Sequence, residues 1–171
     1  MNQAVTPRRP DEHGVPDPFP YMHPTLKANY GNWAWHDRLR PGVLHHVAKN
    51  GDEIWTVRAG TQRQMDVFTI RKLCDLADEF ADGHIRFTTR SNAEFMVTSE
   101  DKTGPLIERL NAAGFPVGGT GNSLSMISHT QGWLHCDIPG TDASGVVKSL
   151  MDELMHEFTH EEMPNRVRMT T

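Results

Sequence analysis

Arginine and threonine side chains alternate along one short segment of this chain, in a pattern typical of anion binding. Arg86, Thr88 and Arg90 are spaced two residues apart. Successive side chains of a β-strand point to opposite faces, so this spacing places all three on one face of a sheet. Arg58 belongs to an earlier alternating segment, and Arg63 follows it closely. Because the planar guanidinium binds carboxylates and oxyanions through two hydrogen bonds, these residues predict an anion-binding surface.

A solvated sheet face carries the same residue types, and it is the alternative interpretation at this point. Arginines on such a face normally pair with acidic side chains. Here Glu94 is the only acidic residue on the neighbouring alternating segment. The shortage of acidic partners favours a polyanionic ligand.

The two cysteines of the chain stand in different contexts. Cys74 falls within an apolar stripe at helical spacing, which predicts a core residue. Cys136 follows a glycine-rich stretch and precedes a turn at residues 140–142. Two cysteines exclude a disulfide scaffold and cannot supply a four-thiolate site alone. The residues therefore leave Cys136 open between a core position and a metal ligand.

Residues 156–160 have the sequence HEFTH, which matches the H-E-x-x-H pattern of zinc peptidases. A catalytic zinc needs a third protein ligand, usually farther along the chain. The only carboxylates that follow are the adjacent Glu161 and Glu162. The two histidines also fall on the polar side of the expected helix. We therefore interpret the segment as a solvated helix face.

The elements that position these residues begin after residue 50. Periodicity predicts strands at 54–58, 84–90 and 93–98, and helices at 65–80 and 101–113. This β-α-β-β-α order forms most of a split βαβ unit. In that unit both helices cover one face of the sheet, which leaves the other face to the arginines. A glycine-rich break follows, and we expect a domain boundary near Val117.

The flanking segments are less regular. Six of the eleven prolines lie within residues 1–24, which disfavours helix and predicts either a disordered tail or an arm that wraps a partner. Residues 30–48 are expected to form an irregular lead-in with a turn at Pro41–Gly42. Beyond the boundary we expect a strand at 123–129, a long helix from Asp142 or Ser144 to about Glu162, and an alternating segment at 166–171.

Composition narrows the classes of function. The chain has 171 residues, a net charge of −5 and a mean hydropathy of −0.55. It contains no apolar run long enough for a membrane span, and its mild acidity argues against nucleic-acid binding. The N-terminus lacks the apolar segment of a secretory signal, so we expect a cytoplasmic protein.

Two blocks of sequence resemble the sirohaem sulfite and nitrite reductases. Residues 57–63 (VRAGTQR) and 85–90 (IRFTTR) are similar to the half-domain of that superfamily. Residues 118–123 (GGTGNS) and 127–142 (ISHTQGWLHCDIPGTD) look like the beta subunits of dissimilatory sulfite reductases. The resemblance covers about residues 17–171.

The resemblance implies an α+β fold in three parts. A proline-rich arm and lead-in (1–50) precede a ferredoxin-like, split βαβ half-domain (51–116) and the first part of a sirohaem and [4Fe–4S] domain (117–171). It implies that Arg58 contacts the sulfur oxyanion and that Cys136 is the first cluster ligand. The sirohaem-binding residues would be Arg63, Arg86, Thr88 and Arg90.

The resemblance also implies an activity and partners. The reaction would be the six-electron reduction of sulfite toward sulfide at sirohaem, fed by the [4Fe–4S] cluster, or its reverse in sulfur oxidisers. The partners would be a homologous alpha subunit in an α2β2 heterotetramer and a small sulfur-carrier protein.

Further cluster cysteines and anion-site lysines of the family are expected after Thr171. We therefore expect this chain to be the N-terminal part of a longer subunit and to be inactive alone. Two alternatives are an assimilatory-type sulfite or nitrite reductase and a cofactor-free ferredoxin-like binding module. The run at 130–142 argues against the first, and a coding frame without further cysteines would favour the second.

Overall fold

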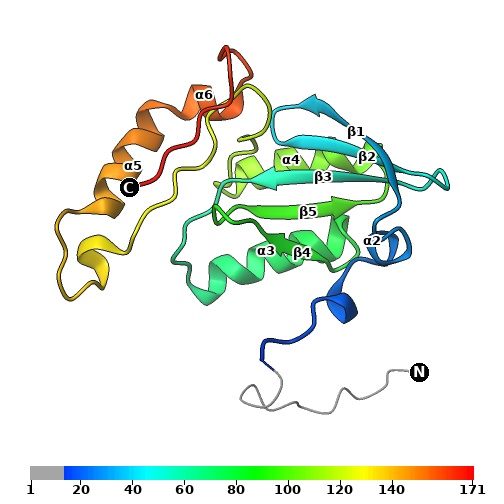
Figure 1. The fold of residues 1–171 in the computed structure, drawn as a ribbon, viewed down its shortest axis with the longest axis horizontal. Coiled ribbons are helices and arrows are strands. Elements are labelled where there is room, and N and C mark those ends of the chain that lie inside the picture. The colour runs from blue at the N-terminus through cyan, green and yellow to red at the C-terminus, as the bar shows by residue number, and fades with distance from the viewer. Residues whose placement is uncertain (1–13) are drawn as a thin grey trace.

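A five-stranded antiparallel sheet forms the centre of residues 14–171, the part of the chain that the computed structural model describes (Figure 1). The strand order is β1-β2-β3-β5-β4. The strands are β1 (Trp33–Arg40), β2 (Val43–Ala48), β3 (Glu53–Ala59), β4 (Ile85–Phe87) and β5 (Ala93–Val97). Two helices, α3 (Val67–Phe80) and α4 (Thr103–Ala112), pack against the sheet, with η2 (Glu100–Lys102) leading into α4. The predicted α+β ferredoxin-like arrangement is confirmed.

The segment before the sheet is partly helical. A short 3₁₀ turn, η1 (Phe19–Tyr21), precedes α2 (Pro24–Ala28). Within the described part of the proline-rich range the helical structure is limited to η1, and α2 starts only at Pro24, which occupies the first turn, where its missing N–H is not needed. The predicted arm at 1–24 falls within the described part only from Gly14 onward.

The expected irregular lead-in at 30–48 is also wrong, because these residues form the β1–β2 hairpin. Trp35 pairs with Val47 and Arg38 pairs with Leu44 in an antiparallel register. The predicted turn at Pro41–Gly42 is confirmed. Gly42 has a φ of 79°, and a Cβ placed on it would lie 2.5 Å from Val117 Cγ1, so glycine is required there on both grounds.

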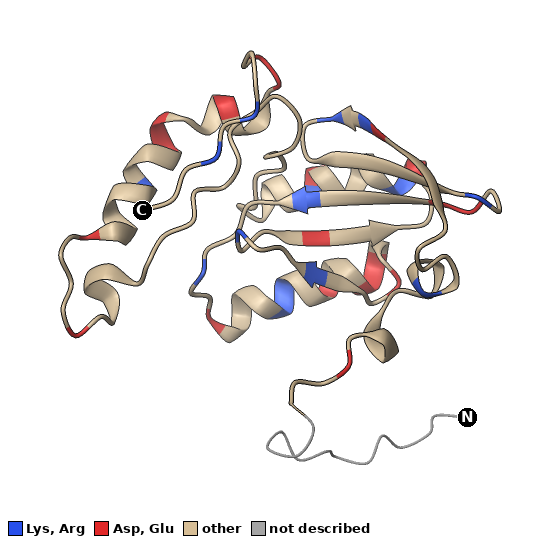
Figure 2. Cartoon of the chain, viewed as in Figure 1, with Lys and Arg blue, Asp and Glu red and all other residues tan. Residues whose placement is uncertain are grey.

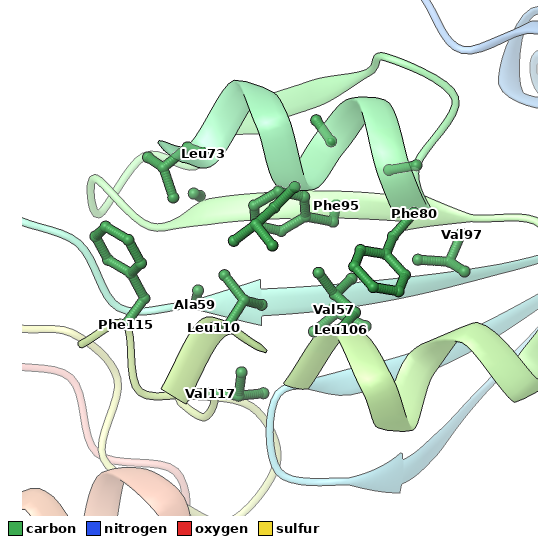
Figure 3. Close-up of a cluster of buried hydrophobic side chains, with 14 of the residues drawn as sticks. Val57, Ala59, Leu73, Phe80, Phe95, Val97, Leu106, Leu110, Phe115 and Val117 are labelled. Carbon is green, nitrogen blue, oxygen red and sulfur yellow. The ribbon is translucent and has the colours of Figure 1, made fainter. Parts of the chain in front are cut away.

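The main core lies between the sheet and the two helices (Figure 3). Strand alternation directs Trp55 and Val57 of β3 to this side, and Phe95 of β5 lies beside them. Leu73 of α3 and Leu106 of α4 complete the contact and are almost fully buried. The sheet therefore has one face committed to helix packing, which leaves the other face for polar side chains.

The prediction that Cys74 lies in this core is wrong, because its side chain is exposed on α3. Leu73, Leu76 and Ala77 form the buried stripe instead. The stripe begins near the middle of the helix, so Phe68 in its first turn is 73% exposed. Asp66 caps the helix by accepting a hydrogen bond from the Thr69 amide at 2.7 Å.

A second, smaller core lies among residues 124–169. It is built on α5 (Ala143–Glu153), α6 (Met155–Thr159) and two extended segments, with η3 (Gly132–Leu134) before α5. The single long helix expected here is wrong, since Leu154 separates α5 from α6 with a φ of −103° and a ψ of 22°. The break aims Phe158 into the glycine-rich stretch, where it is fully buried.

The expected strand at 123–129 is reduced to isolated parallel bridges. Leu124 pairs with Val167, and Ser128 pairs with Thr170. The main core reaches Val117 and the second begins at Leu124. The domain boundary near Val117 stays a prediction. No helix within residues 14–171 has the length and apolar character needed to cross a bilayer.

Candidate functional site

A row of alternating charge crosses three neighbouring strands on the face of the sheet opposite the helices. Figure 2 shows it as basic, acidic and basic segments on β3, β5 and β4. Arg58 and Arg86 are each the register partner of Glu94. The Nη2 of Arg58 donates to one carboxylate oxygen of Glu94 at 2.8 Å, and Arg86 donates to the other. The backbone ladder therefore fixes these three residues side by side.

The three side chains differ sharply in exposure. Glu94 is 1% exposed, Arg58 is 16% exposed and Arg86 is 58% exposed. A buried carboxylate requires compensating charge and hydrogen bonds, and the two guanidiniums supply both. Arg58 also has a buried Nε that no protein atom accepts from. Arg58 thus retains hydrogen-bonding capacity that the folded chain does not use.

Two further arginines bind the extended segments of the second core. Arg90, which follows β4, donates from Nη1 to the carbonyl oxygens of Met169 at 2.9 Å and Met126 at 3.2 Å. Arg166 donates from Nε to Ser125 Oγ at 2.9 Å and from Nη2 to the Gly119 carbonyl at 3.0 Å. Arg90 therefore ties both extended segments to the residues that follow β4, and Arg166 ties the last extended segment to the earlier one and to the glycine-rich stretch.

The arginines line a cavity of about 620 Å³ between the sheet face and the second core. Its lining comprises five arginines, Arg58, Arg86, Arg90, Arg166 and Arg168, together with Phe87, Thr88, Thr89, Asn92, Gly119 and Ser125. No acidic side chain is among these lining residues. Burial lowers the pKa of Arg166, and the nearby Arg168, Arg58, Arg90 and Arg38 lower it further. The cavity is therefore a region of strong positive potential suited to an anion with several negative groups.

The structure brings most of the sequence-predicted site residues together. Arg58, Arg86, Thr88 and Arg90 all line this cavity. Arg63 does not. It lines a second cavity of similar volume, and its guanidinium donates to the His129 carbonyl.

Sequence reasoning missed Arg166 and Arg168. Both lie on the last extended segment, which reaches the cavity only through bridges with residues 124–128. The available signal was their spacing of two residues, the same alternation that identified Arg86 and Arg90.

The second cavity lies beside α5 and has a different lining. Arg63, Arg90 and Lys148 supply positive charge, and Val147 and Met151 of α5 supply apolar surface. Arg90 lines both cavities. The two cavities are therefore adjacent along the junction between the sheet and the second core.

Cys136 lies in the loop after η3, exposed, with its amide donating to the Gly132 carbonyl at 3.0 Å. Its exposure removes the alternative of a core position. Within residues 14–171 no group of three or more histidine, cysteine or acidic side chains is arranged to hold a metal ion. The ligand role of Cys136 stays a prediction.

The histidines of the H-E-x-x-H segment lie on the exposed side of α6 and just beyond it, as expected. The rings of His156 and His160 stack with centroids 4.1 Å apart. His156 also lies 3.1 Å from a carboxylate oxygen of Glu162 and lowers the pKa of that carboxyl. These contacts are those of a polar surface.

Comparisons with known proteins agree with the arrangement described above. Residues 46–113 match a family model described as the nitrite/sulfite reductase ferredoxin-like half domain. Over 182 aligned positions the chain is 46% identical to the dissimilatory-type sulfite reductase beta subunit of Megalodesulfovibrio gigas, covering 99% of this chain and 70% of that one. The chain belongs to the family of dissimilatory-type sulfite reductase beta subunits.

Two other beta subunits of this family extend the comparison. The protein of Nitratidesulfovibrio vulgaris is 42% identical over 99% of this chain and 48% of its own length. That of Archaeoglobus fulgidus is 46% identical over 87% of this chain and 43% of its own length. The chain thus spans 70% of one relative and less than half of the other two.

Two solved structures share the fold. The crystal structure of dissimilatory sulfite reductase I has a TM-score of 0.76 at 13% identity, over 85% of this chain and 38% of that one. The NirA protein of Mycobacterium tuberculosis has a TM-score of 0.58 at 12% identity, over 68% of this chain and 22% of that one. Family membership makes the chain part of a sulfur-group oxidoreductase family, and the beta-subunit name of its relatives implies a partner subunit.

Proposed function

We propose that this chain forms part of a sirohaem site at which sulfite is reduced toward sulfide with six electrons, or at which the reverse reaction runs. The observation that carries the proposal is the cavity of about 620 Å³ lined by five arginines and no acidic side chain. Sirohaem is a tetrapyrrole with several carboxylates at its rim. Arginine forks bind such carboxylates in pairs, so the residues present fit the group.

The side chains of the cavity have different proposed roles, either cofactor binding or substrate binding, according to their position. Arg86 is half exposed at the cavity, and Arg90 and Thr88 lie close to it in sequence, so these residues would hold cofactor carboxylates. Arg58 is held at the buried end and would bind and orient the sulfur oxyanion. When bound, sirohaem supplies an iron centre where the substrate sulfur coordinates and receives electrons.

The [4Fe–4S] cluster needs more than the described residues supply. Such a cluster is held by cysteine thiolates, normally four. Cys136 is the one cysteine near the second core, because Cys74 lies on α3. We propose Cys136 as a single ligand only and derive no step through the cluster. Arg63, at the second cavity, is proposed to support the same cofactor region.

The proposed assembly is an α2β2 heterotetramer with an alpha subunit, and a small sulfur-carrier protein is a further proposed partner. A cytoplasmic location stays a prediction.

The test uses the assembled holoenzyme with substitutions in this subunit. Arg86→Gln and Arg90→Gln are compared with Arg109→Gln, which removes an exposed arginine of α4 from a surface ion pair with Glu79. A charge-assisted hydrogen bond contributes about 1.5–3 kcal/mol. We therefore expect the first two variants to need about 10- to 100-fold more cofactor than the parent protein to reach the same sirohaem occupancy. Full sirohaem content in both, measured by absorbance per complex, would refute the cofactor assignment.

Arg58→Gln separates substrate from cofactor. We expect weaker sulfite binding, seen as a shift of the sirohaem absorbance bands at higher sulfite concentration, with sirohaem content close to that of the parent. Equal losses of sulfite binding and sirohaem in all three cavity variants would show that the division of roles is wrong.

A further inference from the structure

One carboxylate lies within the arginine cluster without lining its cavity. Glu94 is almost fully buried, and each of its two oxygens accepts a hydrogen bond from a different arginine. Its neighbours across the ladder, Arg58 on β3 and Arg86 on β4, are fixed by backbone pairing. Since side-chain position here follows from strand register, Glu94 restrains two cavity residues at once.

The restraint acts unequally on the two arginines. Arg86 is more than half exposed, so its guanidinium has room to turn toward a ligand. Arg58 is 16% exposed and is bound to Glu94 at 2.8 Å, so its guanidinium has little freedom. Three other arginines of the cavity have no carboxylate partner among the described residues. Arg90 donates to a backbone carbonyl and Arg166 donates to a hydroxyl oxygen, while Arg168 lines the cavity. The cavity thus contains two cations partly neutralised by Glu94, of which only Arg58 is also restrained by burial, and three without a carboxylate partner among the described residues.

We propose that Glu94 is a positioning residue that reserves Arg58 for the small oxyanion substrate. By holding the buried Arg58 in place, the carboxylate keeps that guanidinium from turning toward the cofactor carboxylates, which remain for the exposed Arg86 and for the arginines without a carboxylate partner. The unused Nε–H of Arg58 shows that its bonding is incomplete in the folded chain. This inference rests on the proposed function, because it assigns a role toward the same substrate and cofactor.

The test is Glu94→Gln in the assembled holoenzyme, with Glu94→Asp and Glu79→Gln as comparisons. The glutamine keeps the side-chain volume, but its amide NH₂ faces one guanidinium and cannot accept from it. Aspartate keeps the charge. Glu79→Gln removes a carboxylate that also pairs with an arginine, Arg109, but on the exposed helical side.

We expect Glu94→Gln to weaken sulfite binding about tenfold or more, read from the sirohaem absorbance shift and from KM, with sirohaem content per folded complex retained. Glu94→Asp should recover part of the loss, and Glu79→Gln should change neither quantity. Unchanged sulfite binding in Glu94→Gln, with only lower thermal stability, would overturn the inference by showing a purely structural role. Tighter sulfite binding would also overturn it, because Glu94 would then only reduce the positive charge.

A double-mutant cycle tests whether Glu94 acts through Arg58, and Glu94→Asp takes the place of Glu94→Gln in the cycle if the glutamine variant assembles poorly. If Glu94 acts through Arg58, the effect of Glu94→Gln on sulfite binding should vanish in an Arg58→Gln background, in which the carboxylate has one cation fewer to compensate. Additive effects would overturn the positioning role. If Arg58→Gln alone leaves sulfite binding unchanged, the proposed function of Arg58 fails. If Arg58→Gln matters and Glu94→Gln does not, only the role of Glu94 fails.

Discussion

Phe158 allows a direct test of stability, because its side chain joins the second core to the glycine-rich stretch beside the arginine cavity. It is fully buried. A Cβ placed on Gly119 would lie 2.7 Å from its ring, and one placed on Gly60 would lie 3.2 Å from it, so the ring packs directly on backbone. The Gly119 amide also donates to the Phe158 carbonyl at 2.8 Å. Truncating this ring leaves a void that neighbouring glycines cannot fill.

We therefore expect Phe158→Ala to lower the free energy of unfolding by about 3–5 kcal/mol, the usual cost of removing a buried phenylalanine ring. That is a large share of the roughly 5–15 kcal/mol that stabilises a typical domain. With a urea dependence of about 2 kcal/mol per molar, the midpoint of unfolding should fall by roughly 2 M.

Urea unfolding of this chain, followed by circular dichroism, makes the measurement. Phe68→Ala is the matched control, because Phe68 is 73% exposed on α3 and its removal should cost less than about 0.5 kcal/mol. A loss below about 1 kcal/mol for Phe158→Ala, similar to that of the control, would refute the packing described for the junction.

Three further predictions concern a histidine, a helix cap and two glycines. Burial lowers the pKa of His46 to about 4. Unfolded chains bind this proton near pH 6.5, so stability should fall as pH drops from about 6.5 toward 4, and NMR titration of the imidazole should show no protonation near pH 6.5. Asp66→Ala should lower the thermal stability of the chain by about 1 kcal/mol through loss of the α3 cap, and an unchanged melting temperature would contradict this. Gly118→Ala should destabilise strongly, because its Cβ would lie 2.2 Å from the Phe158 carbonyl oxygen. Gly104→Ala, with open space around it in α4, should instead stabilise by about 0.5–1 kcal/mol in the same urea assay, and equal effects of the two substitutions would argue against this reasoning.

The sequence was sufficient to predict elements whose apolar residues repeat clearly. Alternation predicted β3 and the helical stripe predicted α3 within two residues at each end. The strand β1 has no such apolar repeat, because seven of its eight residues are exposed. Its clustered aromatic residues were therefore interpreted as part of an irregular segment. The break at Leu154 depends on a local backbone conformation that apolar periodicity does not record.

The same distinction applies to the site. Arg58 and Arg86 were found because strand alternation places side chains on a common face. The prediction of a strand over 84–90 is wrong at its end, because β4 stops at Phe87 and Arg90 reaches the cavity from the turn that follows. Arg166 and Arg168 show the same spacing of two residues, but they reach the cavity through bridges to residues about forty positions earlier, which no local pattern contains. The importance of Glu94 was underestimated for a similar reason. The sequence shows that Glu94 has no acidic neighbours on its strand. It does not show the strand register that gives Glu94 two arginine partners.

The central claim is that the arginine cavity holds the carboxylates of sirohaem. The most direct measurement is a cryo-electron microscopy map of the assembled holoenzyme at a resolution that shows side chains. We expect cofactor carboxylates within hydrogen-bonding distance of Arg86 and Arg90, with Arg58 still paired to Glu94 and facing the substrate position. A sirohaem bound elsewhere, with this cavity filled by protein side chains, would contradict it.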